Sequence, residues 1–311
     1  MPAKKIILLG GSGFIGSHLV SALSRQGYQI TVPCRRPYRL NHFKLLPGLT
    51  LVEANILDPQ QLQNLFKGQD FAINLLGILN ETGNNSFQQI HVDFVKNLLQ
   101  ACDQNSLSHL LHLSALGADQ ESGSSLYLRS KGEGENLLHS FSRGKLQVTS
   151  FQPSVVFGEG DQFINRFASI LKFCRGFFPL ACSNSRMAPV YVNDLVDKMI
   201  SAINQADSFG KRYTVCGPEV FTLRQIVEKI IQQLNVSCSV LPLNNKLSKL
   251  QARILQVLPG KLMTLDNYDS LQTDSVCTQD SSCPTSLSHY LKGISCLFNS
   301  KKEYDEYRRF H

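Results

Sequence analysis

The strongest constraint on this chain is a glycine-rich turn between an apolar run and an amphipathic stretch, close to its start. Residues 5–9, KIILL, predict a buried strand. Three glycines at a spacing of three follow it, at Gly10, Gly13 and Gly16. Apolar residues then recur at the spacing of one helix face: Ile15, Leu19, Val20 and Leu23. The chain therefore opens as a strand, a tight turn and a helix.

Strands and helices alternate regularly through the first half of the chain. Apolar runs predict strands over residues 28–32, 49–56, 71–77, 109–115 and 146–153. Amphipathic spacing predicts helices over residues 59–67, 87–102 and 129–142. Because parallel neighbours need crossover connections, this alternation predicts an α/β fold with a doubly wound parallel sheet. We expect this Rossmann domain to occupy residues 1–156.

The rhythm loosens from about residue 157. Helical patterns cover residues 163–173, 194–206, 222–234, 247–258 and 287–297, and Thr222 with Gln225 forms a capping-box pattern. Residues 188–192 predict a strand, whereas 177–182 fit either a loop or a strand. We expect a smaller, mostly helical substrate lobe over residues 157–311, with 187–216 returning to the first domain. The polar stretch 272–286 predicts a mobile segment.

Composition excludes several classes of protein. Of 311 residues, 42% are apolar and 18% are charged, which is enough apolar material for a real core. The chain lacks an apolar run of roughly 18–20 residues, and its basic start lacks the features of a signal peptide. Nine cysteines occur without a C-x-x-C pair. We therefore expect a cytoplasmic protein with reduced thiols and no metal site.

The formal net charge of +7 fits either an anionic partner or ordinary solubilising charge. Locally basic stretches occur at residues 35–39, RRPYR, and 301–311, KKEYDEYRRFH. Apart from these two stretches, the sequence shows no basic stripe with interleaved aromatics, and it shows no nucleic-acid-binding motif. We expect no nucleic-acid partner.

The position of the three glycines, after a strand and at the start of a helix, predicts a dinucleotide-binding turn. Gly10 permits the tight turn, Gly13 lets the backbone approach a pyrophosphate, and Gly16 allows close helix packing. The first amides of the helix would then bind the phosphates. A glycine turn without a ligand is the alternative.

The end of the second predicted strand bears on which dinucleotide binds. An acidic residue there holds the ribose hydroxyls of NAD, but this chain has Cys34 followed by Arg35 and Arg36. Two guanidinium groups can pair with a 2′-phosphate, so the sequence favours NADP(H) over NAD(H). A solvated basic loop is the alternative.

A second motif, Tyr127 and Lys131, places a phenol and an ammonium one turn apart on one helix face. A phenol has a pKa near 10, so it is a poor acid or base at neutral pH unless a nearby cation stabilises its anion. Lys131 is placed to supply that charge and to reach a nicotinamide ribose. The pair therefore predicts acid–base chemistry beside the cofactor.

With these residues the chain resembles the extended and atypical short-chain dehydrogenase/reductases, the superfamily of NAD(P)-dependent epimerases and dehydratases. The resemblance covers nearly the whole length through motifs in the family's order: GGSGFIGSHLV, INLLG, HLSALGA, YLRSKGEGE, QPSVVFGEGD, PVYVNDL and YTVCGPEVFTL. More narrowly, LYLRSKGEGE, SVVFGEGDQFINRFA and LPGKLMTLDNYDSL are similar to the subgroup related to the nucleotide-binding accessory subunit (alpha subcomplex subunit 9) of respiratory complex I.

The resemblance implies roles for residues of this chain. It assigns the pyrophosphate to the three glycines and to the loop amides of Ser12, Phe14 and Ile15. It assigns the 2′-phosphate to Arg35 and Arg36, and the adenine and ribose to Asn55, Ile56, Leu76 and Gly77. It places the nicotinamide against Pro153, Val155 and Val156, and gives Tyr127 and Lys131 the catalytic pair.

Three positions depart from the family's pattern. Asn55 stands where the adenine contact is usually Asp, and Leu9 replaces a customary Thr. Ala115 occupies the place of the catalytic serine or threonine, with Ser114 one residue earlier. Because adjacent side chains of a strand point to opposite faces, Ser114 would need a bulge to complete the catalytic site.

Two functional hypotheses follow. The first is an NADP(H)-dependent oxidoreductase, epimerase or dehydratase whose small-molecule substrate is unidentified. Its substrate could have a lipid- or quinone-like tail, which would suit the phenylalanines at 163, 167, 173, 177 and 178. Plain core packing is the alternative role for these phenylalanines.

The second hypothesis is a non-catalytic NADPH-binding accessory, assembly or sensor protein of a membrane respiratory complex, peripheral at the inner face of the membrane. Residues 172–178, KFCRGFF, and the basic tail would then contact a protein partner or anionic lipid. A third hypothesis, a regulator of transcription, rests on fold analogy alone.

Overall fold

The computed structural model describes residues 4–43, 45–83, 85–141, 146–257, 262–278 and 283–293. The chain divides into two compact units: unit 1 is Met1–Pro153 with Leu195–Thr214, and unit 2 is Ser154–Asp194 with Val215–His311. The basic tail 301–311 and the last part of the helix predicted over 287–297 lie outside the described residues.

Unit 1 is built on a seven-stranded sheet in the order β11-β6-β5-β4-β1-β2-β3. Its strands are β1 Lys5–Leu9, β2 Gln29–Cys34, β3 Leu49–Glu53, β4 Phe71–Asn74, β5 His109–Leu113, β6 Gln147–Pro153 and β11 Arg212–Val215. The pairs from β3 through β1 to β6 are all parallel. The predicted doubly wound parallel sheet is confirmed.

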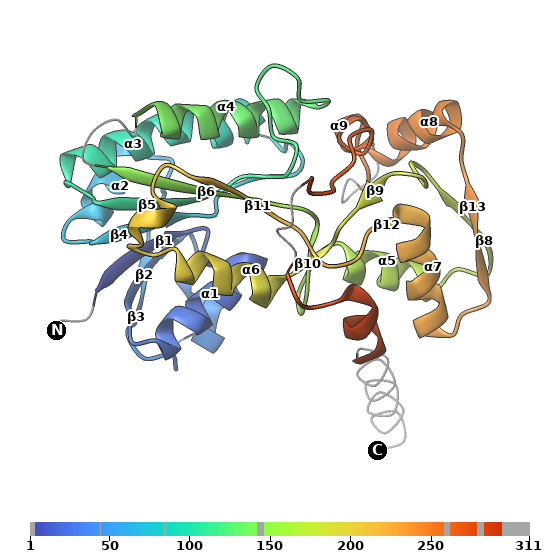
Figure 1. The fold of residues 1–311 in the computed structure, drawn as a ribbon, viewed down its shortest axis with the longest axis horizontal. Coiled ribbons are helices and arrows are strands. Elements are labelled where there is room, and N and C mark those ends of the chain that lie inside the picture. The colour runs from blue at the N-terminus through green and yellow to red at the C-terminus, as the bar shows by residue number, and fades with distance from the viewer. Residues whose placement is uncertain are drawn as a thin grey trace. The chain divides into compact units, whose positions relative to one another are not determined.

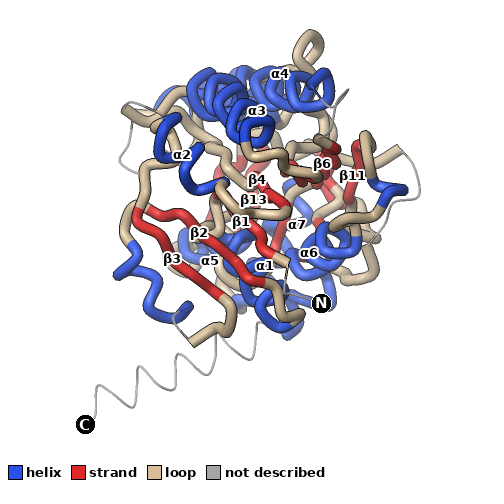
Figure 2. Tube along the Cα trace, turned by 90° about the vertical axis from the view of Figure 1, so that its left-hand side faces the viewer, coloured by secondary structure: helices blue, strands red, loops and turns tan. Residues whose placement is uncertain are grey.

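Helices cover both faces of this sheet. One layer contains α2 Pro59–Phe66, α3 Phe94–Gln104 and α4 Leu126–Phe141, and α1 Phe14–Arg25 and α6 Val192–Ser201 lie on the opposite side (Figures 1 and 2). Short helical turns, η1 Pro37–Phe43 and η3 Ala206–Ser208, complete the unit. The order of strands turns back beside β1, so β1 and β4 end where the connections leave toward opposite faces.

Local sequence explains most of these elements. All four residues from Ile6 to Leu9 are buried, as expected of a central strand. The side chain of Asp58 accepts hydrogen bonds from the amides of Gln60 and Gln61 and so caps α2. The helix predicted over residues 87–102 differs in one respect, since its first part, η2 Gln88–Asp93, is a π-helix.

Unit 2 combines helices with three two-stranded sheets. The pairs are β7 Val156–Phe157 with β10 Val190–Tyr191, β9 Arg186–Met187 with β12 Phe221–Thr222, and β8 Gly176–Leu180 with β13 Cys238–Pro242. The helices are α5 Ile164–Leu171, α7 Leu223–Leu234, α8 Asn245–Leu255 and α9 Leu265–Ser270, and residues 287–293 are also helical. The predicted capping box of Thr222 and Gln225 opens α7.

Part of the segment predicted to be mobile is hydrogen-bonded to the rest of unit 2. The amide of Ser275 donates to the carbonyl of Arg186 at 2.8 Å, and its own carbonyl accepts from Ala188 at 2.9 Å. Asp194 accepts from the amide and the hydroxyl of Thr285, both at 2.9 Å. Among the described residues, no helix combines the length and the apolar character needed to cross a bilayer.

The expectation that all nine cysteines are reduced is wrong at one pair. Cys216 and Cys277 form a disulfide with an S–S distance of 2.03 Å. They are 61 residues apart in sequence, and only the folding of the 272–278 segment onto unit 2 brings them together. Cysteine spacing in a sequence indicates only short motifs such as C-x-x-C, so it could not predict a disulfide between residues this far apart.

Candidate functional site

The glycine turn after β1 has the geometry of a close backbone crossing. Gly10 has a φ of +81°, and a Cβ atom there would lie 3.1 Å from the carbonyl carbon of Leu75. A Cβ on Gly16 would lie 2.4 Å from the carbonyl oxygen of Gly10, closer than atoms can approach. The turn therefore requires glycine at both positions, one for its conformation and one so that α1 can pack on the end of β1.

The amino end of α1 faces this turn and no described side chain caps it. Gly13 is the N-cap residue, with an extended backbone and no side-chain cap. Ser12 is exposed, and Phe14 and Ile15, which follow, are half-buried. Amides in the first turn of a helix lack intrahelical partners and attract anions, so this end of α1 fits a pyrophosphate.

The two predicted phosphate-binding arginines follow the neighbouring strand. Arg35 and Arg36 are exposed directly after β2, which pairs with β1. Cys34, at the strand end, is buried, and burial raises the pKa of its thiol. The nearest carboxylate in the sheet register is on Glu53, opposite Cys34 on β3. The arginines thus lie one strand away from the glycine turn.

Asn55 and Ile56, predicted to contact adenine, lie in the turn after β3. The side-chain oxygen of Asn55 accepts from the backbone amide of Leu57 at 3.2 Å. The backbone amide of Asn55 donates to the side-chain oxygen of Gln61 at 2.9 Å. Ile56 packs against the core beneath α2 and α3. Asn55 therefore stabilises its own turn. An uncharged amide oxygen is enough for this hydrogen bond, so the carboxylate of an Asp is not needed.

Leu76 and Gly77 follow β4. The amide of Leu76 donates to the side-chain oxygen of Asn74 at 3.0 Å, and Asn74 is itself buried against His112. Gly77 is exposed, and a Cβ there would lie 3.0 Å from Nζ of Lys131. This contact brings the predicted ribose-binding loop to the predicted catalytic lysine.

The predicted catalytic pair lies on α4, as the spacing required. Lys131 is only 5% exposed, and its ammonium group donates to the carbonyl of Leu113, at the end of β5, at 2.9 Å. Burial lowers its pKa to about 8, while the nearby Glu135 carboxylate acts in the opposite direction. Tyr127 lies one turn earlier on the same helix. The buried ammonium thus sits where β4 and β5 end.

His91 is a part of the site that the sequence did not predict. Its Nε2 accepts from the amide of Ile78 at 3.1 Å, so in the neutral ring Nδ1 carries the proton and donates to Ser130 at 2.8 Å. Burial, assisted by the charge of Lys131, lowers the pKa of His91 to about 2. The Tyr127 ring lies edge-on to His91, with centroids 5.7 Å apart. His91 therefore links the loop after β4 to the turn of α4 that carries Tyr127.

Ser114 is engaged elsewhere in a buried network. It is 4% exposed, and its hydroxyl donates to Glu135 at 2.7 Å. Glu135 also accepts from the side chain of Gln152 at 3.0 Å and lies 3.6 Å from the guanidinium of Arg212. Ala115 follows Ser114 and offers no hydroxyl. The one hydroxyl at this strand end is thus held by a carboxylate.

The residues predicted to line the nicotinamide divide between the units. Pro153 ends β6 in unit 1, where its carbonyl accepts from the amide of Leu116 at 3.0 Å. Val155 packs against the core of unit 2, and Val156 pairs with Val190 between β7 and β10. Their contact with a cofactor stays a prediction.

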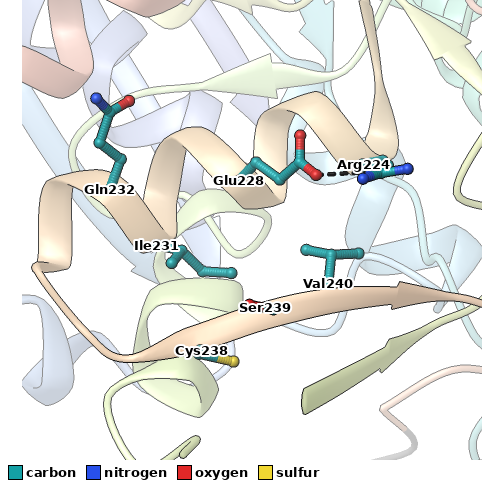
Figure 3. A pocket seen from close by; sticks show the side chains of 7 residues that line it. All are labelled: Arg224, Glu228, Ile231, Gln232, Cys238, Ser239 and Val240. Atoms are coloured by element: carbon teal, nitrogen blue, oxygen red, sulfur yellow. Dashed lines mark hydrogen bonds and ion pairs between the residues drawn. The ribbon is translucent and has the colours of Figure 1, made fainter. Parts of the chain in front are cut away.

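The structure therefore brings together the glycine turn, Gly77, Lys131 and Tyr127 within unit 1, and adds His91 and Glu135. Glu135 had a signal, since it follows Lys131 by four residues on the same face. His91 had none, because the π-helix that carries it breaks the helical spacing. A separate open pocket of about 300 Å³ lies in unit 2 between α7 and β13, and it contains none of the predicted site residues (Figure 3).

Comparison with known proteins agrees with this geometry. The chain is 31% identical over 229 residues to mouse NADH dehydrogenase [ubiquinone] 1 alpha subcomplex subunit 9, mitochondrial, covering 72% of this chain and 59% of the relative. It is 25% identical over 197 residues to the ceramide reductase of Caulobacter vibrioides, covering 63% and 60%. The chain thus spans about three fifths of the length of these curated relatives.

Solved structures share the fold. A variant of UDP-glucuronic acid 4-epimerase from Bacillus cereus, in complex with UDP-4-deoxy-4-fluoro-glucuronic acid and NAD, superposes with a TM-score of 0.67 at 17% identity. The match covers 86% of this chain and 99% of that one. The family described as "NAD dependent epimerase/dehydratase family" matches residues 6–216, which is more than half of the sequence. The chain therefore belongs to the NAD-dependent epimerase/dehydratase family.

Proposed function

We propose that this chain is an NADP(H)-dependent oxidoreductase whose acid–base residue is Tyr127. The observation that carries the proposal is the buried ammonium of Lys131, held by Leu113 beside Gly77 and one turn from Tyr127. A buried cation stabilises a phenolate, so Tyr127 can exchange a proton with a substrate hydroxyl near neutral pH. The bound nicotinamide would supply or accept the hydride.

The residues of unit 1 fit a dinucleotide. The amino end of α1 would hold the pyrophosphate, and the loop after β4 would hold the ribose beside Lys131. Arg35 and Arg36 support NADP(H) over NAD(H), because they follow the strand end where a carboxylate would otherwise bind the ribose. The preference for NADP(H) is part of the proposal.

Calorimetry with NADPH and NADH tests the cofactor preference. Replacing Arg35 and Arg36 together with serine should weaken NADPH binding roughly 100-fold or more, since each charge-assisted hydrogen bond contributes about 1.5–3 kcal/mol and about 1.4 kcal/mol corresponds to a factor of ten. NADH binding should stay unchanged. Arg39→Ser, an exposed arginine in η1, is the matched control. Equal affinity of the wild type for both nucleotides would refute the preference.

For the substrate, we propose a lipid- or quinone-like carbonyl compound. Support comes from a relative named as a ceramide reductase. The aromatic stretch supports it only in part, because Phe163, Phe167 and Phe178 pack into the core of unit 2 while Phe173 and Phe177 are exposed. Oxidation of NADPH with lipid ketones, short-chain quinones and UDP-sugars as acceptors tests this class, with Tyr127→Phe as the inactive control.

One observation favours the second candidate, an NADPH-binding accessory protein of a respiratory complex. The Ser114 hydroxyl is held by buried Glu135, and Ala115 offers none, so the position that polarises a carbonyl in this family is unsupported. The mouse relative is also named as a subunit of NADH dehydrogenase. If wild type and Tyr127→Phe bind NADPH equally and no acceptor oxidises it, the accessory role replaces the oxidoreductase.

A further inference from the structure

Exposed apolar side chains gather on one part of unit 2. Of the fourteen large apolar residues exposed among the described residues, nine belong to this unit. Seven of them lie on or next to β8, β13 and α8, and we name these seven the apolar strip: Phe173, Phe177, Leu241, Leu247, Leu250, Ile254 and Val257. Phe173 is 88% exposed and Val257 is 80% exposed. Such a gathering differs from single exposed residues, which are common on any surface.

The β8·β13 pair has one covered face and one bare face. Phe178 and Val240 are register partners and pack into the core of unit 2 with α5 and α7. Phe177 and Leu241 alternate with them and are exposed. Figure 1 shows β8 and β13 side by side, with α5 and α7 toward one of their sides. Pro179 and Ser239, which share the face of Phe177 and Leu241, are exposed as well, so this face of the pair is open to solvent.

Helix α8 is turned with small residues inward and large apolar residues outward. Ser248 and Ala252 are buried, and the Ser248 hydroxyl accepts from the amide of Cys182 at 3.3 Å. Leu247, Leu250 and Ile254 recur at helical spacing and are exposed by about half. This is the reverse of a helix that buries its leucines in its own protein.

The two elements adjoin and form one surface. The side chain of Gln251, on α8, donates to the carbonyl of Pro179, on β8, at 2.9 Å. The amide of Leu243, just after β13, donates to the carbonyl of Leu180 at 3.1 Å. The apolar strip therefore runs from the start of β8 along the pair to α8.

The segments that carry the strip have one sign of charge, and the neighbouring acidic residues, Glu228 on α7 and Asp266 and Asp269 on α9, lie outside them. Residues 162–193 contain four Lys or Arg and no Asp or Glu, and residues 229–265 contain five Lys or Arg and no Asp or Glu. On α8 the basic residues Lys246, Lys249 and Arg253 form a second exposed stripe beside the leucines. Arg175, beside exposed Phe173, is exposed as well. A surface of this kind attracts a partner that is both apolar and anionic.

We propose that unit 2 docks on the surface of a bilayer containing anionic lipids, with the apolar strip inserted at the level of the head groups. A helix with Leu and Ile on one stripe and Lys and Arg on the next has the composition of helices that lie in a membrane interface. Pairing with a second copy would bring two basic surfaces together, which like charge opposes. The docking does not depend on the nucleotide site, so it stands or falls separately from the proposed function.

Vesicle flotation of the full chain tests this docking. The probes are vesicles of phosphatidylcholine alone and of phosphatidylcholine with 30 mol% phosphatidylglycerol, a composition chosen as roughly that of an anionic leaflet. We expect binding only to the anionic vesicles and release by raising salt. Neutralising Lys249 and Arg253 together, as glutamines, should weaken partitioning roughly 25-fold, since each basic residue near the surface contributes about a factor of five.

Two further variants separate charge from insertion and from misfolding. Leu250→Ser with Ile254→Ser should reduce binding while leaving the salt dependence in place. Phe141→Ser with Lys211→Gln, an apolar and a basic residue exposed on unit 1, should bind as the wild type does. Circular dichroism and NADPH titration show that each variant is folded.

Three outcomes would overturn the docking proposal. These are absence of binding to anionic vesicles, equal binding of the α8 variants and the wild type, and a concentration-dependent dimer in light scattering that Leu250→Ser with Ile254→Ser converts to monomer. Binding to an acidic protein without binding to vesicles would likewise replace the bilayer with a protein partner.

Discussion

Mild acid should unfold unit 1, because its core holds histidines that must be neutral. His91, His109 and His112 are at most 3% exposed. Burial lowers the pKa of His91 to about 2 and that of His109 to about 4, and it lowers the pKa of His112 well below its usual value. Burial also lowers the pKa of His139, on α4, to about 4.

The hydrogen bonds show why these rings resist protonation. Nδ1 of His109 accepts from the amide of Asn204 at 3.1 Å, so Nε2 carries the proton and donates to Thr149 at 2.9 Å. A second proton on the His109 ring would sit on Nδ1, where it would face the amide N–H donor of Asn204. The same holds for Nε2 of His91 and the amide of Ile78.

The size of the effect follows from proton linkage. The folded pKa lies below the unfolded pKa of about 6.5, so the unfolded chain binds more protons and stability falls as pH drops below that value. At pH 5, 1.5 units lower, each histidine destabilises the fold by about 2 kcal/mol at 1.36 kcal/mol per unit. The three fully buried histidines give about 6 kcal/mol, and half-buried His139 adds less because solvent screens it. This sum is comparable with the whole stability of a typical domain, about 5–15 kcal/mol.

Urea unfolding at pH 7, 6 and 5 measures this slope. The chain has no tryptophan, so circular dichroism is the suitable signal. His91→Gln keeps a donor and an acceptor but cannot take up a proton, so its stability should fall less steeply, by about 1.36 kcal/mol for each pH unit. A wild-type stability that stays level between pH 7 and 5, or a variant with the wild-type slope, would refute the assignment of buried neutral rings.

Three other changes test the site and unit 2. Gly16→Ala places a Cβ 2.4 Å from the Gly10 carbonyl, so we expect a loss of about 1–3 kcal/mol and NADPH binding weakened at least roughly tenfold, measured by thermal unfolding and calorimetry. Glu135→Gln removes the charge that raises the pKa of Lys131, so this pKa should fall further below about 8. NADPH binding, measured against pH, should then weaken from a lower pH upward. An unchanged pH dependence of binding would contradict the coupling of the two residues. Cys277→Ser opens a loop of 61 residues and should destabilise unit 2 by about 4 kcal/mol in thermal unfolding without reductant, whereas the same variant in reductant should match the reduced wild type.

The fold of unit 1 was predictable because its signals are local. Buried parallel strands appear as short apolar runs, and a capping residue such as Asp58 marks the start of a helix within a few residues. The π-helix before α3 was not predictable, since it inserts a residue into an otherwise regular apolar spacing. In unit 2, β7, β9, β10 and β12 are two residues long, too short for any period to show.

The candidate site was predictable only where one stretch of sequence contains the whole feature. The glycine turn and the Tyr127–Lys131 pair are such features, since their geometry is set within one turn of chain. The partners of Lys131 come from distant segments, at Gly77 and Leu113, and no spacing rule joins them. The disulfide of Cys216 and Cys277 fails for the same reason.

The geometry of α4 bears on how the two candidate functions are related. Tyr127, Lys131 and Glu135 are spaced by four residues, so one face of the helix presents a phenol, an ammonium and a carboxylate in a row. A buried ammonium is unfavourable unless charge or hydrogen bonds offset its desolvation, and here Leu113 and Glu135 do so before any nucleotide binds. If Lys131 binds the ribose as proposed, it is preorganised for that role, whether or not hydride is transferred. Catalysis asks more, namely a hydroxyl facing the substrate carbonyl, and Ser114 is turned to Glu135 instead. Under the proposed roles, nucleotide binding needs fewer residues than catalysis does, so we expect this chain to bind the nucleotide even where it lacks turnover.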